Sequence, residues 1–267
     1  MFGLFSYIRN MRLLITYTLL VLLLSNCSVV GTYHQNSVNT PCFNNTNNYQ
    51  IRAGYGNKNY LAQIAAKPYK NFSFLLNTSF SDFQNNSDFS LGYTQFGLFN
   101  SNLGIEGFLG GGFGNTNHKF EKNTFHLLWD YWYTNNYDIT NKFYKFCPQL
   151  HIYYSFENNI QLALFTRISE IHFNEYNIES GITDSTVFFN KHITNLKVRV
   201  LDIGMTLKYE IKHVGFFLQA TYTSNNSKVI LPSDIRFQRK FPVYLGLGIN
   251  LYWNSFSRKI TPTPKAH

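Results

Sequence analysis

FPVYLGLGINLYW, residues 241–253, is the stretch of sequence that decides the fold. Every odd position is large and apolar, whereas the even positions are small or polar, with Gly246, Gly248 and Asn250 at their centre. A period of two predicts a β-strand that has one apolar face. That face must lie against a protein core or against lipid, and the rest of the chain distinguishes these two surroundings.

The composition favours strands and turns over helices. Of the 267 residues, 18% are aromatic and only 14% are charged, and the mean hydropathy is −0.20. A usual charged share is about 25%, and a mean hydropathy below zero excludes a helix-bundle membrane protein. The net charge is +9, but Lys and Arg are scattered without a basic run, so we expect no nucleic acid partner.

The N-terminus reads as a secretory signal over residues 1–26. Arg9 and Arg12 precede an apolar run at 13–24, which is too short for a good membrane span. Residues 24–27, LSNC, resemble a bacterial lipobox, although Asn26 stands where Gly or Ala is usual. We therefore expect Cys27 to be acylated and to become the first mature residue. The alternative is a plain signal peptide with an incidental cysteine, and Met11 is a second possible start.

A polar, Asn-rich stretch, residues 27–48, reads as a flexible leader, and segments of period two follow it over residues 49–256. The expected strands are 49–56, 60–67, 72–80, 89–99, 103–113, 142–156, 160–173, 198–211, 215–223 and 241–253. The alternation shifts at Phe96, which indicates a bulge, and slips again near Ile171. Residues 257–267 read as a polar periplasmic tail.

The connections alternate in length. Tight turns are expected at 68–71, 100–102, 157–159 and 212–214, and longer polar connections at 81–88, 114–141, 174–194 and 224–240. Only the first connection, 57–59, is short where a long one is expected. Ten strands with sorted loops are typical of outer-membrane barrels, whose chain ends lie on the side of the short turns. This predicts an anchor at the periplasmic side and pairing of the last strand with residues 49–56.

The predicted fold class is therefore all-β, an antiparallel up-and-down transmembrane β-barrel of about ten strands after a lipoprotein-type signal peptide. Charges lie on the polar faces alone, where they would make a poor dry core but are able to pair across a narrow lumen. The predicted lumen charge network comprises Arg52, Glu106, Lys145, Arg167, Asp202, Lys208 and Glu210. The alternative is a water-soluble, lipocalin-like barrel tethered by lipid.

The leader at 32–44, the run YLAQIAAKPYKNFSFLLNT at 60–78 and the turn at 157–159 carry a resemblance. Together they resemble a large group of mostly uncharacterised Bacteroidota outer-membrane β-barrel lipoproteins. The resemblance implies an envelope barrel that follows a lipidated cysteine, and it implies no particular activity.

Residue patterns for chemistry are weak. Besides Cys27 the chain has two cysteines, Cys42 and Cys147, which make no disulfide framework. No zinc-ligand spacing exists, so we expect neither metal nor cofactor. A rim hydrolase, omptin-like or lipid A-modifying, would place His with an acid or Ser in the long connections. Its candidates are His118, His126, Asp130, Asp138, Glu170, His172, Asp184, Ser185 and His192, and none has a spacing that demands catalysis.

The sequence therefore favours a non-catalytic structural, adhesive or envelope-partner role, with a narrow channel as an alternative. Trp129, Tyr131, Trp132 and Tyr133 offer a platform for an envelope protein or a surface polysaccharide. The other interpretation of this segment, which we favour, is that two strands continue beyond the membrane and these rings pack on them. Outer-membrane lipid is the remaining expected partner.

Overall fold

The computed structural model describes residues 30–31, 37–44, 48–56, 59–99, 101–126, 131–156, 159–182, 188–225, 235–236 and 243–253. The strands are β1 Val30–Gly31, β2 Tyr49–Gly56, β3 Asn59–Tyr69, β4 Phe72–Phe80, β5 Gln84–Leu98, β6 Leu103–His126, β7 Tyr131–Phe146, β8 Gln149–Ser155, β9 Ile160–Ile182, β10 Phe188–Ile211, β11 Val214–Asn225, β12 Ile235–Arg236 and β13 Val243–Trp253. In this part of the chain, no helix is long and apolar enough to cross a membrane.

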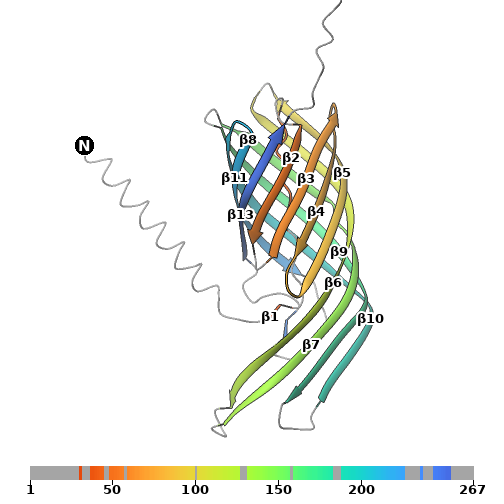
Figure 1. The fold of residues 1–267 in the computed structure, drawn as a ribbon. Coiled ribbons are helices and arrows are strands. Elements are labelled where there is room, and N and C mark those ends of the chain that lie inside the picture. The colour runs from red at the N-terminus through yellow and green to blue at the C-terminus, as the bar shows by residue number, and fades with distance from the viewer. Residues whose placement is uncertain are drawn as a thin grey trace, which may run out of the picture.

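The strands form a closed antiparallel barrel (Figure 1). Strands β7 and β8 both pair with β6 and β9, so they form one barrel strand that is interrupted at Cys147 and Pro148. Proline has no N–H to donate to a ladder, which explains the break. With β7 and β8 counted together, the barrel has the ten strands that the sequence predicts.

The barrel closes between its last and first strands, as predicted. β13 pairs with β2 from Gly246 opposite Gly56 to Trp253 opposite Tyr49. The short connections after β3, β5, β8 and β10 share one end of the barrel, here called the turn end. The opposite end is called the extension end, because four strands continue past it.

The two faces of the wall differ sharply in polarity. Inward side chains are mostly polar or charged and are buried, with Arg52 at 0% exposure. Outward side chains are large and apolar, with Leu247 at the centre of β13 62% exposed. The apolar face of residues 243–253 therefore points away from the barrel interior, while Phe241 and Pro242 lie outside the described residues.

The bulge predicted at Phe96 lies after that residue, at Gly97, so Phe96 itself does not change face. The register of β5 against β6 shifts between Phe96 and Leu98, and Gly97 has a φ of 79°. That φ lies in the left-handed region, where glycine has no Cβ to clash. Phe96 keeps its inward direction, because its ring stacks on Tyr153 at 6.1 Å.

Four strands, β6, β7, β9 and β10, extend as a sheet beyond the barrel (Figure 1). This corrects the predicted polar connections at 114–141 and 174–194, most of which are strand. The connection predicted at 81–88 is also shorter, because β5 already begins at Gln84. The interpretation of the fifth and sixth expected strands as continuing past the barrel is confirmed. Neither face of these segments is uniformly apolar in sequence, so the period of two is hard to see there.

The polarity of both faces inverts where the extension leaves the barrel. On β9, Arg167 and Ser169 point inward and are buried, and the next inward residues, Ile171 and Phe173, are apolar and also buried. The outward residues change in the opposite sense, from Ile168 to Glu170. The pairing of β9 with β10 keeps one register across Ile171, whereas the pairing of β9 with β7 shifts between Lys142 and Phe143, opposite Glu175 and Phe173. The slip predicted near Ile171 therefore combines a change of surroundings at Ile171 with a strand irregularity a few residues farther along β9.

The extension has an apolar core of its own. Its buried members come from β7, β9 and β10, namely Tyr137, Ile139, Phe143, Ile171, Phe173, Tyr176, Ile178, Val198 and Val200. Charged side chains such as Lys142 and Arg199 occupy the opposite, exposed face. This arrangement, apolar inside and charged outside, is the one expected of a sheet in water.

Candidate functional site: a lumen filled by the leader

The leader occupies the lumen of the barrel. Residues 38–43 are buried, with Val38 and Thr40 at 0% exposure, and Ser37 and Asn44 are half-buried. The sequence predicts a flexible leader over 27–48, and the structure instead gives residues 37–44 defined contacts with the wall. The reason is long-range, because the partners of this polar segment come from strands throughout the chain.

Cations of the wall donate hydrogen bonds to leader carbonyl groups. Lys208 Nζ donates to Pro41 O at 2.6 Å, and Arg52 Nη2 donates to Thr40 O at 3.2 Å. Lys67 Nζ donates to Asn44 O at 3.2 Å. Buried cations need such acceptors, because an unpaired buried charge is costly. Lys208 and Arg52 of the predicted network therefore bind the backbone of the leader.

Uncharged and acidic wall groups complete the contact. The N–H of Phe43 donates to Glu106 Oε1 at 2.8 Å, and the hydroxyl of Tyr153 donates to Phe43 O. Gln219 Nε2 donates to Val38 O at 2.8 Å. The leader thus forms hydrogen bonds with side chains of β2, β3, β6, β8, β10 and β11. The phenyl ring of Phe43 packs with Ala65, Leu75 and Phe108.

The other predicted lumen charges pair within the wall. Arg167 contacts Asp202 at 2.8 Å, and Thr223 donates to the same carboxylate at 2.7 Å. Glu106 contacts His151 Nδ1 at 3.0 Å, so this histidine is a paired lumen residue, as its place on the polar face of a strand predicts. Of the predicted network, only Glu210 is half-exposed, one residue from the turn end of β10.

Lys145 pairs with an acid that the sequence analysis missed. Its Nζ lies 2.8 Å from Asp88 Oδ1, and both side chains are buried, at 0% and 1% exposure. Asp88, Gly112 and Lys145 occupy one row on three neighbouring strands. A Cβ at Gly112 would lie 2.3 Å from that carboxylate oxygen, so the glycine leaves the gap that the ion pair spans. The sequence places Asp88 in a connection, and the available signal is that it directly precedes Phe89, where the outward apolar series begins.

The glycines of the closing strand have a different neighbour from the one predicted. The sequence suggests that Gly246, Gly248 and Asn250 leave lumen room for charges on other strands. A Cβ at Gly248 would lie 2.6 Å from the ring of Phe217, and Asn250 accepts from Arg52 Nε at 2.8 Å. The guanidinium carbon of Arg52 lies 4.2 Å from the centroid of the Phe217 ring. The small face therefore accommodates an aromatic ring that covers Arg52.

Of the residues considered for a rim hydrolase, those that the structure describes lie on the extension or beside it. His118 stacks on Phe83 at 4.5 Å, and Asp138 pairs with Lys119 at 2.8 Å. The side chain of His192 bonds to Asn177 on β9. Asp130, Asp184 and Ser185 lie outside the described residues, and the side chain of His126 is also outside them.

Glu170 and His172 form the closest approach of an acid to a histidine among the candidates whose side chains are described. Their side chains are 2.8 Å apart, and Arg199 lies 3.5 Å from the same carboxylate. The hydrogen bonds from His172 and Arg199 lower the pKa of Glu170. The hydrogen bond to Asp138 likewise raises the pKa of Lys119. These side chains lie on the outward face of the extension and are paired with one another.

The aromatic platform is described only in part. Trp129 lies outside the described residues, as do the side chains of Tyr131, Trp132 and Tyr133. The backbone of these last three residues begins β7 and pairs with β6, for example Trp132 opposite Phe125. The platform sequence therefore lies at the far end of the extension.

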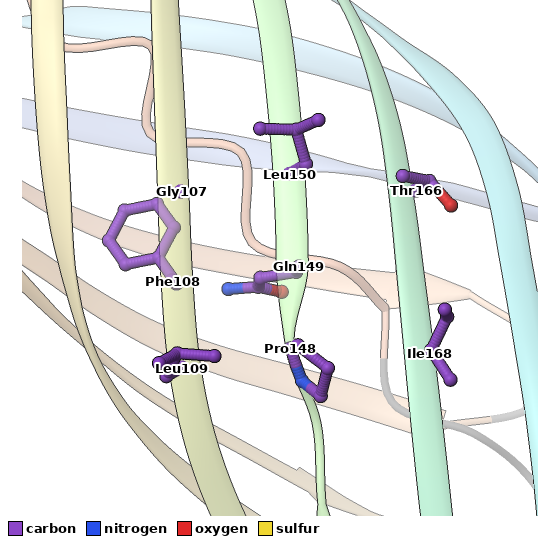
Figure 2. Close-up of a pocket in the computed structure, with 8 residues that line it drawn as sticks. All are labelled: Gly107, Phe108, Leu109, Pro148, Gln149, Leu150, Thr166 and Ile168. Carbon is purple, nitrogen blue, oxygen red and sulfur yellow. The ribbon is translucent and has the colours of Figure 1, made fainter.

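The break between β7 and β8 leaves an apolar notch of about 300 Å³ in the wall (Figure 2). It is lined by Gly107, Phe108, Leu109, Pro148, Gln149, Leu150, Thr166 and Ile168. Leu109, Leu150 and Ile168 belong to the exposed apolar exterior, so the notch opens on the outer wall, and Phe108 at its inner side also packs against Phe43 of the leader.

Over the described part of the chain, no group of three or more His, Cys, Asp or Glu side chains is placed to hold a metal ion. Cys42 and Cys147 are both buried free thiols. Cys27 and residues 1–26 lie outside the described ranges. No protein-family model and no curated protein matches this chain.

Proposed function

We propose that this protein is a lipid-anchored outer-membrane β-barrel, of the Bacteroidota type that its sequence resembles, with a non-catalytic structural, adhesive or envelope-partner role. The observation that carries the membrane assignment is the inversion of polarity on β9 and β10. Outward residues are apolar, apart from Thr166, up to Ile168 and Leu201, and are charged or polar from Glu170 and Arg199 onward. Such a boundary is expected where the surroundings change from hydrocarbon to water.

The inner face supports the same boundary. Within the barrel the inward residues are mostly polar, and beyond it they form the apolar core of the extension. A water-soluble barrel would place apolar residues inside and charges outside along the whole length of its strands. The lipid-tethered soluble barrel is therefore disfavoured.

The filled lumen disfavours a narrow channel. Residues 37–44 occupy the interior, and their carbonyl groups bind Arg52, Lys67 and Lys208. Small barrels whose interior is plugged do not offer a continuous water path. The extension, which carries the platform sequence Tyr131–Tyr133 at its far end, supports a partner-binding role outside the membrane.

A charge placed on the outer wall tests the membrane assignment. Leu247→Arg should lower the free energy of unfolding by about 2–4 kcal/mol in lipid vesicles, because the side chain would face hydrocarbon. On a water-exposed surface, the same change is usually within about 0.5 kcal/mol. Asn117→Arg, at an exposed position of the extension, is the matched control and should change little.

The measurement is urea unfolding in vesicles, in which the heat-dependent shift of the folded band on a gel reports the folded fraction. Equal stability of Leu247→Arg and the wild type would contradict the membrane assignment, as would a purified protein that stays soluble without detergent.

The partner-binding role has its own test. Replacing Trp129, Tyr131, Trp132 and Tyr133 by Ala should abolish retention of the folded protein on surface polysaccharide or envelope protein isolated from the source cells. Unchanged retention would show that the aromatic platform does not bind the partner. A hydrolytic activity that is lost in His172→Ala would favour the rim hydrolase over the non-catalytic role.

A further inference from the structure

We propose that the leader crosses the barrel from the extension end to the turn end, so that the acylated Cys27 lies on the same side of the membrane as the extension. This inference rests on the proposed function for the membrane and for the acyl group. The sequence alone predicts the opposite side, because barrel chain ends usually lie with the short turns.

The direction of the leader follows from its contacts along a single strand. Ser37 O accepts from Gln63 Nε2, whereas Asn44 O accepts from Lys67 Nζ. β3 runs from Asn59 at the extension end to Tyr69 at the turn end, so residue 67 is closer to the turns than residue 63. The leader therefore advances toward the turn end as its residue numbers rise.

A second set of contacts agrees with this direction. The N–H of Phe43 bonds to Glu106, three residues after β6 begins at the turn end, and its carbonyl bonds to Tyr153, two residues before β8 ends there. Lys67 N then bonds to Asn48 O, and β2 begins at Tyr49. The leader thus leaves the lumen at the turn end and enters the barrel wall directly.

The preceding residues lie at the opposite end. β1 pairs in parallel with β12, with Val30 opposite Ile235. β12 belongs to the connection that leaves β11 at Asn225 and enters β13 at Val243, which is at the extension end. Figure 1 shows β1 beside the mouth from which the extension leaves.

The length of the chain fixes the side on which the anchor lies. Cys27 precedes Val30 by three residues, and three residues span at most about 11 Å. The apolar band of an outer-membrane barrel is about 25 Å tall. Cys27 therefore cannot reach the membrane surface at the turn end while Val30 stays paired with β12. Because short turns face the periplasm in such barrels, the acyl chains would enter the outer leaflet, and the N-terminal end of the leader would lie outside the cell.

Three epitope tags in the full-length protein test this arrangement. One is inserted after Ser28, one within the β9–β10 connection at 183–187, and one after His267. Antibody binding is measured on intact cells and on permeabilised cells. We expect the tags after Ser28 and at 183–187 to be equally accessible on intact cells, and the tag after His267 to require permeabilisation.

The outcomes separate the inference from the proposed function. A Ser28 tag that behaves like the His267 tag overturns the leader direction and leaves the membrane barrel intact. Three tags that are all accessible on intact cells, with a protein extracted without detergent, overturn the membrane barrel itself. Labelled palmitate that still enters Cys27→Ala overturns the acylation of Cys27 without bearing on the leader.

A cross-link in the purified protein tests the position of the leader independently of tags. Ser37 and Gln219 are hydrogen-bonded, so Ser37→Cys with Gln219→Cys, in a chain carrying Cys42→Ser and Cys147→Ser, should form an intramolecular disulfide. The control pair Ser37→Cys with Asn117→Cys should not. Equal yields for the two pairs would overturn the placement of the leader in the lumen.

Discussion

At the residue scale, the lumen is a set of specific polar pairs. Strand alternation is enough to assign Arg52, Arg167, Asp202 and Lys208 to the inward face, because each lies among outward apolar neighbours. It cannot reveal which partner each side chain finds, since the partners come from strands distant in sequence. Asp88 was missed for a related reason, because residues 81–88 are polar at nearly every position and show no alternation.

The buried pair of Lys145 and Asp88 predicts a non-additive pair of substitutions. Lys145→Met should cost about 3–5 kcal/mol of stability, because it leaves a buried carboxylate without its cation. The double variant Asp88→Asn, Lys145→Met should lose clearly less than the sum of the two single variants. Urea unfolding in vesicles measures both effects.

The exposed pair of Lys119 and Asp138 is the control for this cycle. Lys119 is 72% exposed, so Lys119→Met should change stability little. Additive losses from Asp88→Asn and Lys145→Met would show that the 2.8 Å contact contributes no coupling.

At the scale of elements, the extension is the part that the sequence predicts least well. The strands of the barrel proper are visible because their outward faces are uniformly apolar, as in β13 and the barrel part of β10. In the extension the apolar residues change faces at Ile171, and the outward residues become polar. The period of two in hydropathy is therefore broken in the sequence. The backbone pairing between β9 and β10 nevertheless continues without a register shift.

Glu170 predicts a pH dependence of the extension, which lies beyond the apolar belt. His172 and Arg199 lower its pKa in the folded protein, so the folded state binds this proton less readily than the unfolded state. The stability that the pair contributes is therefore present above the usual Glu pKa of about 4.3 and lost as the pH falls through the lowered value. Glu170→Gln should slightly speed amide exchange of β9 and β10 at pH 7, and this difference should shrink as the pH falls towards 3.

Hydrogen exchange of the two proteins at both pH values measures this effect. Glu179→Gln, at an exposed position farther along β9, is the control. A difference between Glu170→Gln and the wild type that persists unchanged at pH 3 would rule out the ionised carboxylate as its source.

At the scale of the whole molecule, the leader and the barrel form one unit. The sequence predicts the closed barrel and the β13–β2 pairing, because both depend on local alternation and on unpaired edges being unacceptable in hydrocarbon. It does not predict the leader in the lumen, because a short polar segment with Pro41 and several Asn reads locally as a linker. Only the inward donors of distant strands make its burial favourable.

Removal of the leader predicts a change in permeability. The full protein should be silent in planar bilayers, because residues 37–44 fill the lumen. Deletion of residues 37–44 should give discrete conductance steps and a lower unfolding temperature, since Arg52, Lys67 and Lys208 lose their acceptors. Replacement of the same residues by a Gly/Ser segment of equal length controls for the chain connection.

The expected order of conductance is the deletion first, the Gly/Ser replacement next and the wild type last. A silent deletion variant that still shows the heat-dependent band shift would mean that the wall side chains close the lumen by themselves.

The position of the leader also constrains the order of assembly. Residues 37–44 immediately precede β2, and β2 forms one side of the seam with β13. Chains rarely pass through a loop that has already formed, and an acylated end would have to be drawn through a packed interior to do so. The barrel must then close around a segment already in place. β13, the barrel strand farthest along the chain, therefore completes the ring around residues that precede every strand of the barrel.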